Sequence, residues 1–178
     1  RAAVEGDTED RDGGICYLDR LLPRLVDLLG DHLPAIERGA AGRALAKLND
    51  PRNEALDVDA MRLCYVPAGK FLMGSDKKQD DQAFSDEKPQ HEVDLPTYWI
   101  GQFPVTNAQY EMFVEDGGYG ITRYWKEAEA ADVWLWEGKV KGRNDDSPRS
   151  APMDLDEPFN LSNHPVVGVT WYEMLAFT

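Results

Sequence analysis

The chain has 178 residues, of which 42% are hydrophobic and 10% aromatic, and this is enough for one ordinary globular domain with a short extension. Its formal charge of −14 argues against nucleic acid as a partner, because affinity for phosphate backbones comes largely from Lys and Arg. No run approaches the ~18 apolar residues that cross a bilayer, and the acidic start "RAAVEGDTEDRDGG" is unlike a signal peptide. We therefore expect a soluble chain without a membrane partner.

The two cysteines, Cys16 and Cys64, lie in different segments of the chain. Two thiols cannot form the dense disulfide framework of a small secreted domain. The sequence therefore predicts two buried, reduced thiols and a cytoplasmic protein.

Residues 1–14 are predicted to be disordered or flexible, and residues 15–50 to form a helical extension. Leucines recur there at steps of three and four, the spacing of one helical face: Leu18, Leu21, Leu22, Leu25, Leu28 and Leu29. Because proline is tolerated only in the first turn of a helix, Pro23 predicts that the first helix starts near Leu21 or Leu22. A second helix is predicted from Pro34 to Asn49, and residues 51–60 are predicted to be a linker.

From Met61 onward the pattern changes from helical to alternating. Apolar residues alternate in "MRLCYVPAGKFLMG", and Val66-Pro67-Ala68-Gly69 suits a type I turn, so the sequence predicts a hairpin within residues 61–74. Gly69 and Gly74 are expected at positions that a side chain would crowd. The charged, aperiodic stretch from residue 76 to 88 predicts a solvated loop. Metal binding by its aspartates is the lesser alternative.

Two later segments each place a capped helix after an apolar stretch. Thr106 with Gln109, and Thr170 with Glu173, match the capping-box pattern at the start of a helix. Trp171 is expected to anchor the core. Between the two helices, residues 123–131 predict a short helix and residues 133–136 a strand, within a long stretch that is otherwise irregular.

Three motifs in this order resemble the formylglycine-generating enzyme, or sulfatase-modifying factor, family: "VPAGKFLMGSD", "EKPQHEVDLPTYWIGQFPVTNAQYEMFV" and "HPVVGVTWYEMLAF". The resemblance implies an α+β domain over residues 61–178, with an irregular C-type-lectin-like fold and little regular structure. The preceding "GRALAKLNDPR" is similar to extensions of such domains in bacterial multidomain proteins.

The resemblance does not carry over a catalytic residue. Members that oxidise a sulfatase cysteine use a copper-binding cysteine pair downstream of the motif that matches "HPVVGVTW", and neither Cys16 nor Cys64 stands there. Cys64 as a nucleophile with His91 or His164 as base is a weaker reading than Cys64 as a small buried hydrophobe.

Metal ligands are not assigned either. A second branch of the family, the iron-dependent sulfoxide synthases of ergothioneine biosynthesis, binds its metal through histidines shared with a helical domain. The three histidines here, His32, His91 and His164, lack a ligand spacing, so no metal site is predicted. Calcium, which is common in the wider fold, is left open as a cofactor. Its sites need several oxygen ligands that converge from distant loops, and the spacing of residues along the sequence does not test whether they do.

A third branch uses the fold as a binding platform, as in the variable proteins of diversity-generating retroelements. Aromatic side chains on a loop supply contact energy at small entropic cost. This predicts five ligand-binding residues, for which packing onto the core is the alternative: Tyr119, Tyr124, Trp125, Trp134 and Trp136.

The resulting interpretation is a non-catalytic module that binds a protein or small ligand. The alternative is a copper-dependent formylglycine-generating oxidase whose catalytic cysteines lie beyond residue 178. A third reading is a structural segment whose acidic helices serve oligomerisation. Because the last helix has barely two turns after Thr170, we expect the rest of the domain, or another chain, to complete the core.

Overall fold

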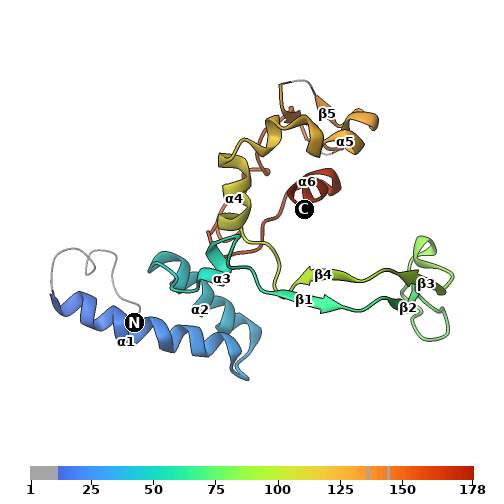
Figure 1. The fold of residues 1–178 in the computed structure, drawn as a ribbon. Helices are drawn as coiled ribbons and strands as arrows, with labels where there is room; N and C mark the ends of the chain where they lie inside the picture. The colour runs from blue at the N-terminus through green and yellow to red at the C-terminus, as the bar shows by residue number, and fades with distance from the viewer. Residues whose placement is uncertain (1–11, 136, 144) are drawn as a thin grey trace. The chain divides into compact units, whose positions relative to one another are not determined.

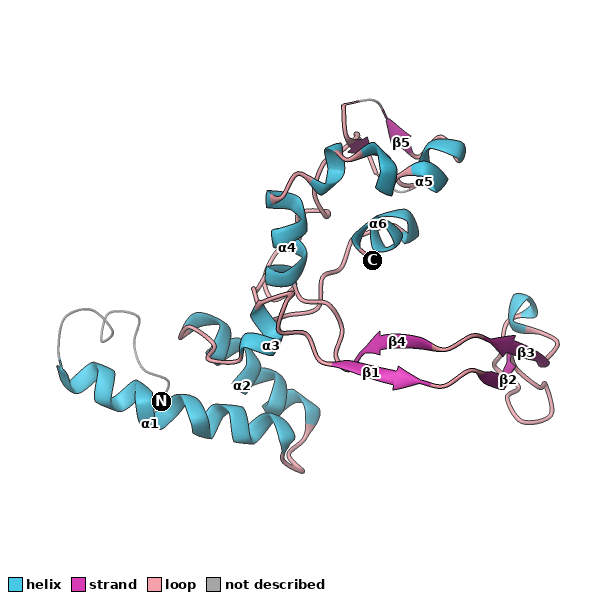
Figure 2. Ribbon diagram, viewed as in Figure 1, coloured by secondary structure: helices cyan, strands magenta, loops and turns pink. Residues whose placement is uncertain are grey.

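The computed structural model describes residues 12–135, 137–143 and 145–178, with the backbone alone for residues 12, 13, 15 and 16. Short helices and two-stranded antiparallel sheets alternate with long irregular segments, which confirms the predicted α+β class (Figures 1 and 2). The chain divides into two compact units. The first combines Arg1–Met61 with Pro104–Thr178, and the second is Arg62–Phe103.

The N-terminal part of the first unit is helical. Helix α1 (Asp12–Gly30) packs against α2 (Ala35–Lys47), and the short α3 (Asn53–Leu56) follows within the stretch predicted as a linker. The expected start of the first helix near Leu21 is wrong, since α1 continues through Pro23. Pro23 removes one backbone hydrogen bond from α1. The packing of the leucine face of α1 against α2 can outweigh this loss of stability. The predicted disorder of residues 1–14 lies mostly outside the described residues.

The second unit is a long antiparallel ribbon, in which four strands form two separate two-stranded ladders. Strand β1 (Leu63–Val66) pairs with β4 (Tyr98–Gly101), and β2 (Gly69–Met73) pairs with β3 (His91–Leu95); η1 (Ser85–Glu87) lies in the connection between β2 and β3. The predicted hairpin between β1 and β2 is therefore wrong, because these strands follow one another along the ribbon. Pro67 has no N–H to donate and the N–H of Ala68 bonds to Thr97 Oγ1 at 3.1 Å, so the ladder is interrupted there without a reversal of the chain.

Three residue-level expectations can be checked in this unit. Gly74 has φ +86°, and a Cβ there would lie 2.6 Å from the Glu87 carbonyl oxygen, so its predicted crowding is confirmed. Gly69 is not crowded, since nothing lies within 4 Å of such a Cβ. Cys64 is exposed rather than buried, because a two-stranded ribbon leaves the side chains of both faces accessible. The side chain of Cys16 lies outside the described residues.

The two predicted capped helices are confirmed. Helix α4 (Asn107–Glu115) and helix α6 (Trp171–Phe177) each begin with a complete capping box, in which the cap threonine and the third helical residue bond each other's backbone N–H. Between them lie η2 (Gly118–Gly120), η3 (Thr122–Tyr124), α5 (Lys126–Ala130), β5 (Trp134–Leu135) and β6 (Lys139–Val140). The short helix and the strand predicted in this stretch are thus present.

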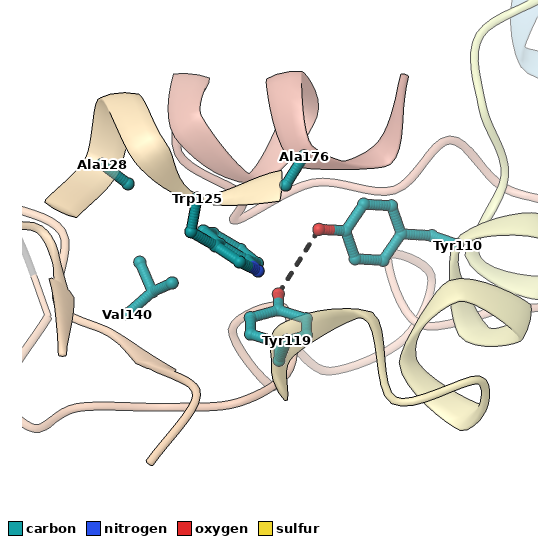
Figure 3. Close-up of a cluster of buried hydrophobic side chains, with 6 residues drawn as sticks. All are labelled: Tyr110, Tyr119, Trp125, Ala128, Val140 and Ala176. Atoms are coloured by element: carbon teal, nitrogen blue, oxygen red, sulfur yellow. Dashed lines mark hydrogen bonds between the residues drawn. The ribbon is translucent and has the colours of Figure 1, made fainter. Parts of the chain in front are cut away.

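The core of the first unit is small and aromatic. Figure 3 shows its buried members, which come from α4, η2, α5 and the residue before it, β6 and α6: Tyr110, Tyr119, Trp125, Ala128, Val140 and Ala176. Trp171 is 59% exposed, so its predicted role as a core anchor is wrong. Because Tyr172, Ala176 and Phe177 form the face of α6 that meets the core, the preceding position points away from it.

Candidate ligand-binding site

The aromatic residues predicted to bind a ligand are partly brought together, but in the core. Tyr119 and Trp125 are 4% and 1% exposed, with ring centroids 5.1 Å apart, and Trp134 stacks on Trp125 at 6.5 Å. Tyr124 is half-buried, and its ring centroid lies 6.4 Å from that of Phe113. Trp136 lies outside the described residues. Tyr119 and Trp125 therefore offer almost no ring surface to a ligand, and the binding role of the set stays a prediction.

A buried polar network borders this aromatic cluster. The carboxylate of Glu173, 0% exposed, accepts hydrogen bonds from Nη1 and Nη2 of Arg149, with Nη2–Oε2 at 2.7 Å, and the Tyr119 hydroxyl donates to its Oε1. Arg149 Nε donates to Asp145 Oδ2 at 3.0 Å. Such two-pronged contacts between ions specify geometry as well as energy. The network therefore connects α6 to the irregular segment between β6 and α6 that carries Asp145 and Arg149.

Burial sets the protonation states of this network. It raises the pKa of Tyr110 to about 12, and it raises that of Tyr119 further because the hydroxyl also donates to the Glu173 carboxylate. Burial alone would lower the pKa of Arg149, but hydrogen bonds and attraction from Glu173 outweigh it and raise that pKa. The tyrosines stay neutral and the arginine charged throughout the physiological range.

Arg149 and Asp145 also form part of the wall of an open pocket of about 460 Å³. Trp171 and Tyr172 line the same pocket with their rings edge to face, at a centroid distance of 5.1 Å. The remaining lining residues are Val133, Gly142, Arg143, Met153, Gly168, Val169 and Thr170. The pocket combines apolar side chains and an exposed indole with two arginines and one aspartate, a mixture that suits a ligand with an apolar body and a polar group.

A second pocket, of about 280 Å³, lies beside α4. It is lined by Asn107, Tyr110, Glu111 and Val114 of that helix, by residues 151–155, and by Phe159, Asn160 and Val167. Met153 belongs to both pockets, so the segment Ala151–Met153 contributes to the walls of both.

Sequence reasoning missed the two residues, Arg149 and Glu173, whose hydrogen bonds fix the walls of these pockets. Glu173 was recognised only as the partner of Thr170 in a capping box, and Arg149 not at all. Arg149 stands 24 residues before Glu173 in a stretch without periodicity, so no spacing rule points to their contact. The polar network was invisible to pattern analysis for that reason.

The residues considered for metal binding are scattered or already engaged. His164 Nδ1 hydrogen-bonds Asn163 Oδ1 at 3.0 Å, and burial, with repulsion from Arg43, lowers the pKa of this histidine. Within the described ranges there is no group of three or more His, Cys, Asp or Glu side chains placed to hold a metal ion. The one cysteine with a described side chain, Cys64, does not form a copper-binding pair with another described thiol. The described residues therefore do not fit a copper or iron centre.

Among the helices that the structure describes, none has the length and apolar character that a membrane span requires.

Comparison with known proteins places the chain in a family. The sulfatase-modifying factor enzyme 1-like domain matches residues 49–178. A hercynine oxygenase of Mycolicibacterium smegmatis is 33% identical over 120 residues, which is 63% of this chain and 26% of that protein. The formylglycine-generating enzyme of Mus musculus is 30% identical over 136 residues, 65% of this chain and 34% of that enzyme.

A relative with a different named activity matches a similar share of the chain. The serine/threonine-protein kinase pkn1 of Chlamydia caviae is 31% identical over 110 residues, 62% of this chain and 15% of the kinase. The chain thus spans between 15 and 34% of the length of these relatives. Since the domain match covers most of the chain, and the ordered motifs and capped helices agree with it, the chain belongs to the formylglycine-generating enzyme, or sulfatase-modifying factor, family.

Proposed function

We propose that this chain provides a ligand- or protein-binding module on a C-type-lectin-like scaffold, and that it binds at the pocket bounded by Trp171 and Tyr172. One observation carries the proposal: an aromatic pair, with Trp171 59% exposed, lines an open pocket of about 460 Å³. An exposed tryptophan gains much from being covered, which is why this residue is enriched among the residues that dominate binding energy.

The wall of the pocket is held in place before any ligand arrives. Arg149 is bonded to Glu173, to Asp145 and, through Nη1, to the Ala151 carbonyl oxygen at 2.6 Å. Asp145 Oδ2 also accepts the N–H of Gly142 at 2.8 Å. Because these groups are already engaged with one another, binding would require little further ordering of the wall, and this favours affinity.

The aromatic residues predicted from the sequence enter this proposal as support for the pocket. Val133, which lines the pocket, precedes Trp134, whose indole donates to the Tyr119 carbonyl oxygen at 3.1 Å. Trp134 in turn stacks on Trp125. We infer that these rings back the pocket wall, while Tyr124 and Trp136 remain candidates for direct contact.

The proposal includes a protein partner or a further part of the same domain. In the unit Arg62–Phe103, large apolar side chains are exposed on both strand ladders: Leu63, Tyr65, Phe71, Leu72, Met73, Tyr98, Trp99 and Ile100. Such an accumulation of exposed apolar residues is typical of surfaces that another protein segment covers. The domain would run from residue 61 to 178, after the helical extension 15–50 and the linker 51–60. The proposal keeps a cytoplasmic location, because two cysteines in different segments do not form the disulfide framework of a small secreted domain.

The indole N–H signals of the five tryptophans test the binding site by NMR. The probe is N-acetylphenylalanine, which carries an aromatic ring and a carboxylate, with its neutral amide for comparison. The Trp171 signal, assigned as the one lost in Trp171→Phe, should shift on titration. The Trp99 signal, assigned through Trp99→Phe, should not. A titration that leaves the Trp171 signal unmoved, or moves both signals alike, contradicts the proposed site.

A second candidate function is that of an oxidase, and the names of two relatives favour it. The chain is similar to hercynine oxygenases and to formylglycine-generating enzymes at about a third identity. In this case the scaffold would hold a substrate while a copper-binding cysteine pair, contributed from beyond residue 178, performs the oxidation. Anaerobic copper titration of the natural full-length protein, with thiols counted in parallel, decides between the candidates. Stoichiometric copper held by thiolates would support the oxidase and refute the non-catalytic module.

A further inference from the structure

The pocket beside α4 differs from the aromatic pocket in the charge of its lining. We propose that this 280 Å³ pocket binds an organic cation, an alkylammonium or guanidinium group carried on an apolar stem. This inference goes beyond the proposed function, since it rests on other residues, and the two pockets share only Met153.

The walls of the pocket are mainly hydrocarbon. Six apolar side chains line it in addition to the rings of Tyr110 and Phe159: Val114, Ala151, Pro152, Met153, Leu155 and Val167. Lysine, arginine and simple amines combine an apolar stem with a charged end, so such walls can cover the stem. A Ca²⁺ ion held directly by the protein would instead need six to eight oxygen ligands, whereas the carboxylates of this lining are two, Glu111 and Asp154.

An exposed aromatic ring contributes a second feature that suits a cation. Phe159 lines the pocket and is 55% exposed, so one side of the ring is open to a ligand. The face of an aromatic ring attracts ammonium and guanidinium groups placed over it. The backbone of Phe159 is anchored, because Asn107 Nδ2 donates to its carbonyl oxygen at 2.7 Å.

The charged residues among the pocket's lining are both acidic. Glu111 comes from α4, whereas Asp154 comes from the irregular segment before α6, so the two carboxylates reach the pocket from different elements. Both side chains are exposed. A cation at the mouth would gain charge-assisted hydrogen bonds while its stem is buried against the walls.

Hydrogen bonds hold the segment that carries this wall. The Ala151 carbonyl oxygen accepts from Arg149, and the N–H of Met153 donates to the Gly168 carbonyl oxygen at 3.1 Å. The volume of about 280 Å³ lies near the lower limit for small-molecule sites, roughly 300 Å³. It therefore suits one amino-acid side chain or a small amine better than a large ligand.

The probes for a titration of the full chain differ only in charge. Nα-acetyl-lysine amide and Nα-acetyl-arginine amide carry the cation, whereas Nα-acetyl-norleucine amide replaces it with a methyl group. We expect the backbone NMR signals of residues 111, 114, 154 and 159 to shift with the cationic probes, and the neutral probe to bind roughly tenfold more weakly. A comparison with n-butylammonium distinguishes a free amine from a protein side chain as the source of the cation.

Substitution of the two carboxylates tests their role directly. Glu111→Gln and Asp154→Asn should each weaken the cationic probes by about tenfold and leave the neutral probe unchanged. Glu115→Gln, one turn further along α4, and Asp156→Asn are matched controls that should leave all affinities unchanged. Equal binding of cationic and neutral probes overturns the proposal, as do equal effects of test and control variants. The N-acetylphenylalanine experiment with Trp171 reports on the other pocket, so the two proposals can fail separately.

Discussion

Glu173 receives more buried hydrogen bonds than its place on a short helix suggests. Its carboxylate accepts from Arg149, from Tyr119 and from the N–H of Thr170, and its own N–H donates to Thr170 Oγ1. It lies 24 residues from Arg149 and 54 from Tyr119. One side chain thus caps its own helix and joins two distant segments, so its contribution to stability should be large.

Glu173→Gln should lower the free energy of unfolding by about 3 kcal/mol, because it removes the charge of the fully buried carboxylate that both Nη atoms of the half-buried Arg149 contact and leaves Asp145 as its remaining anion. Urea denaturation followed by circular dichroism measures the change. Glu127→Gln, at an exposed position on α5, is the matched control and should change the value by less than about 0.5 kcal/mol. Equal unfolding free energies for the two variants would show that the network contributes nothing.

At the scale of secondary structure, the two capping boxes were predictable because all their atoms lie within four residues. The contacts that the two cap residues make with distant parts of the chain were not predictable in this way. Thr106 is buried, and its hydroxyl also donates to the Ala55 carbonyl oxygen at 2.7 Å, a contact across 51 residues. Thr170 makes the same local bonds, and the described residues include no distant acceptor for its hydroxyl. The same motif should therefore contribute differently at its two sites.

Thr106→Ala should cost about 2 kcal/mol, since it removes a cap and leaves the part-buried Ala55 carbonyl oxygen without its donor, whereas Thr170→Ala should cost about 1 kcal/mol. The midpoints and slopes of urea unfolding give both values. Thr106→Ser and Thr170→Ser keep the hydroxyl and should recover most of each loss. The reverse order of the two alanine variants would contradict this account.

Gly74 and Gly69 form a natural pair for testing backbone strain in the second unit. Gly74→Ala would place a Cβ 2.6 Å from the Glu87 carbonyl oxygen at φ +86°, whereas Gly69→Ala meets no atom within 4 Å. We expect Gly74→Ala to weaken the β2–β3 ladder by at least about 1 kcal/mol and Gly69→Ala to have little effect. Amide hydrogen exchange of residues 70–73 and 91–95 measures the ladder. Similar exchange rates in the two variants would refute the distinction.

What the sequence could and could not predict follows from the range of the interactions. The helices capped by Thr106 and Thr170 and the short helix near Arg123 depend on neighbouring residues, and they were predicted. The pairing of β1 with β4 depends on residues more than thirty positions apart, and the turn signal at Pro67 suggested the wrong partner. Trp171 was misassigned because its type suggests burial, while the phase of α6 turns it outward.

At the scale of the whole molecule, the family match begins at residue 49, near the end of the helical extension and before the proposed start of the domain at residue 61. Asp50, 5% exposed, lies at this junction and accepts bonds from Arg52 Nη2 at 2.5 Å and from Asn163 Nδ2 at 2.7 Å. Asn163 Nδ2 also donates to the Gly42 carbonyl oxygen in α2 at 2.9 Å. Asn163 belongs to the domain and Gly42 to the extension, so this cluster links the two within one unit.

Acid should loosen that link in a way that depends on one carboxylate. Burial alone would raise the pKa of Asp50, but the hydrogen bonds from Arg52 and Asn163 outweigh it and lower the pKa below 3.8. A pKa lower in the folded than in the unfolded state stabilises the fold above the unfolded value and loses this effect as the pH falls through the folded one. Asp50→Asn should therefore be less stable than the parent by about 1–3 kcal/mol at pH 6.5, and the difference should shrink towards pH 3. Urea unfolding at both pH values measures it, with Asp27→Asn on the exposed side of α1 as the control. A difference that stays constant between pH 6.5 and pH 3 would mean that the charge of Asp50 does not hold the extension to the domain.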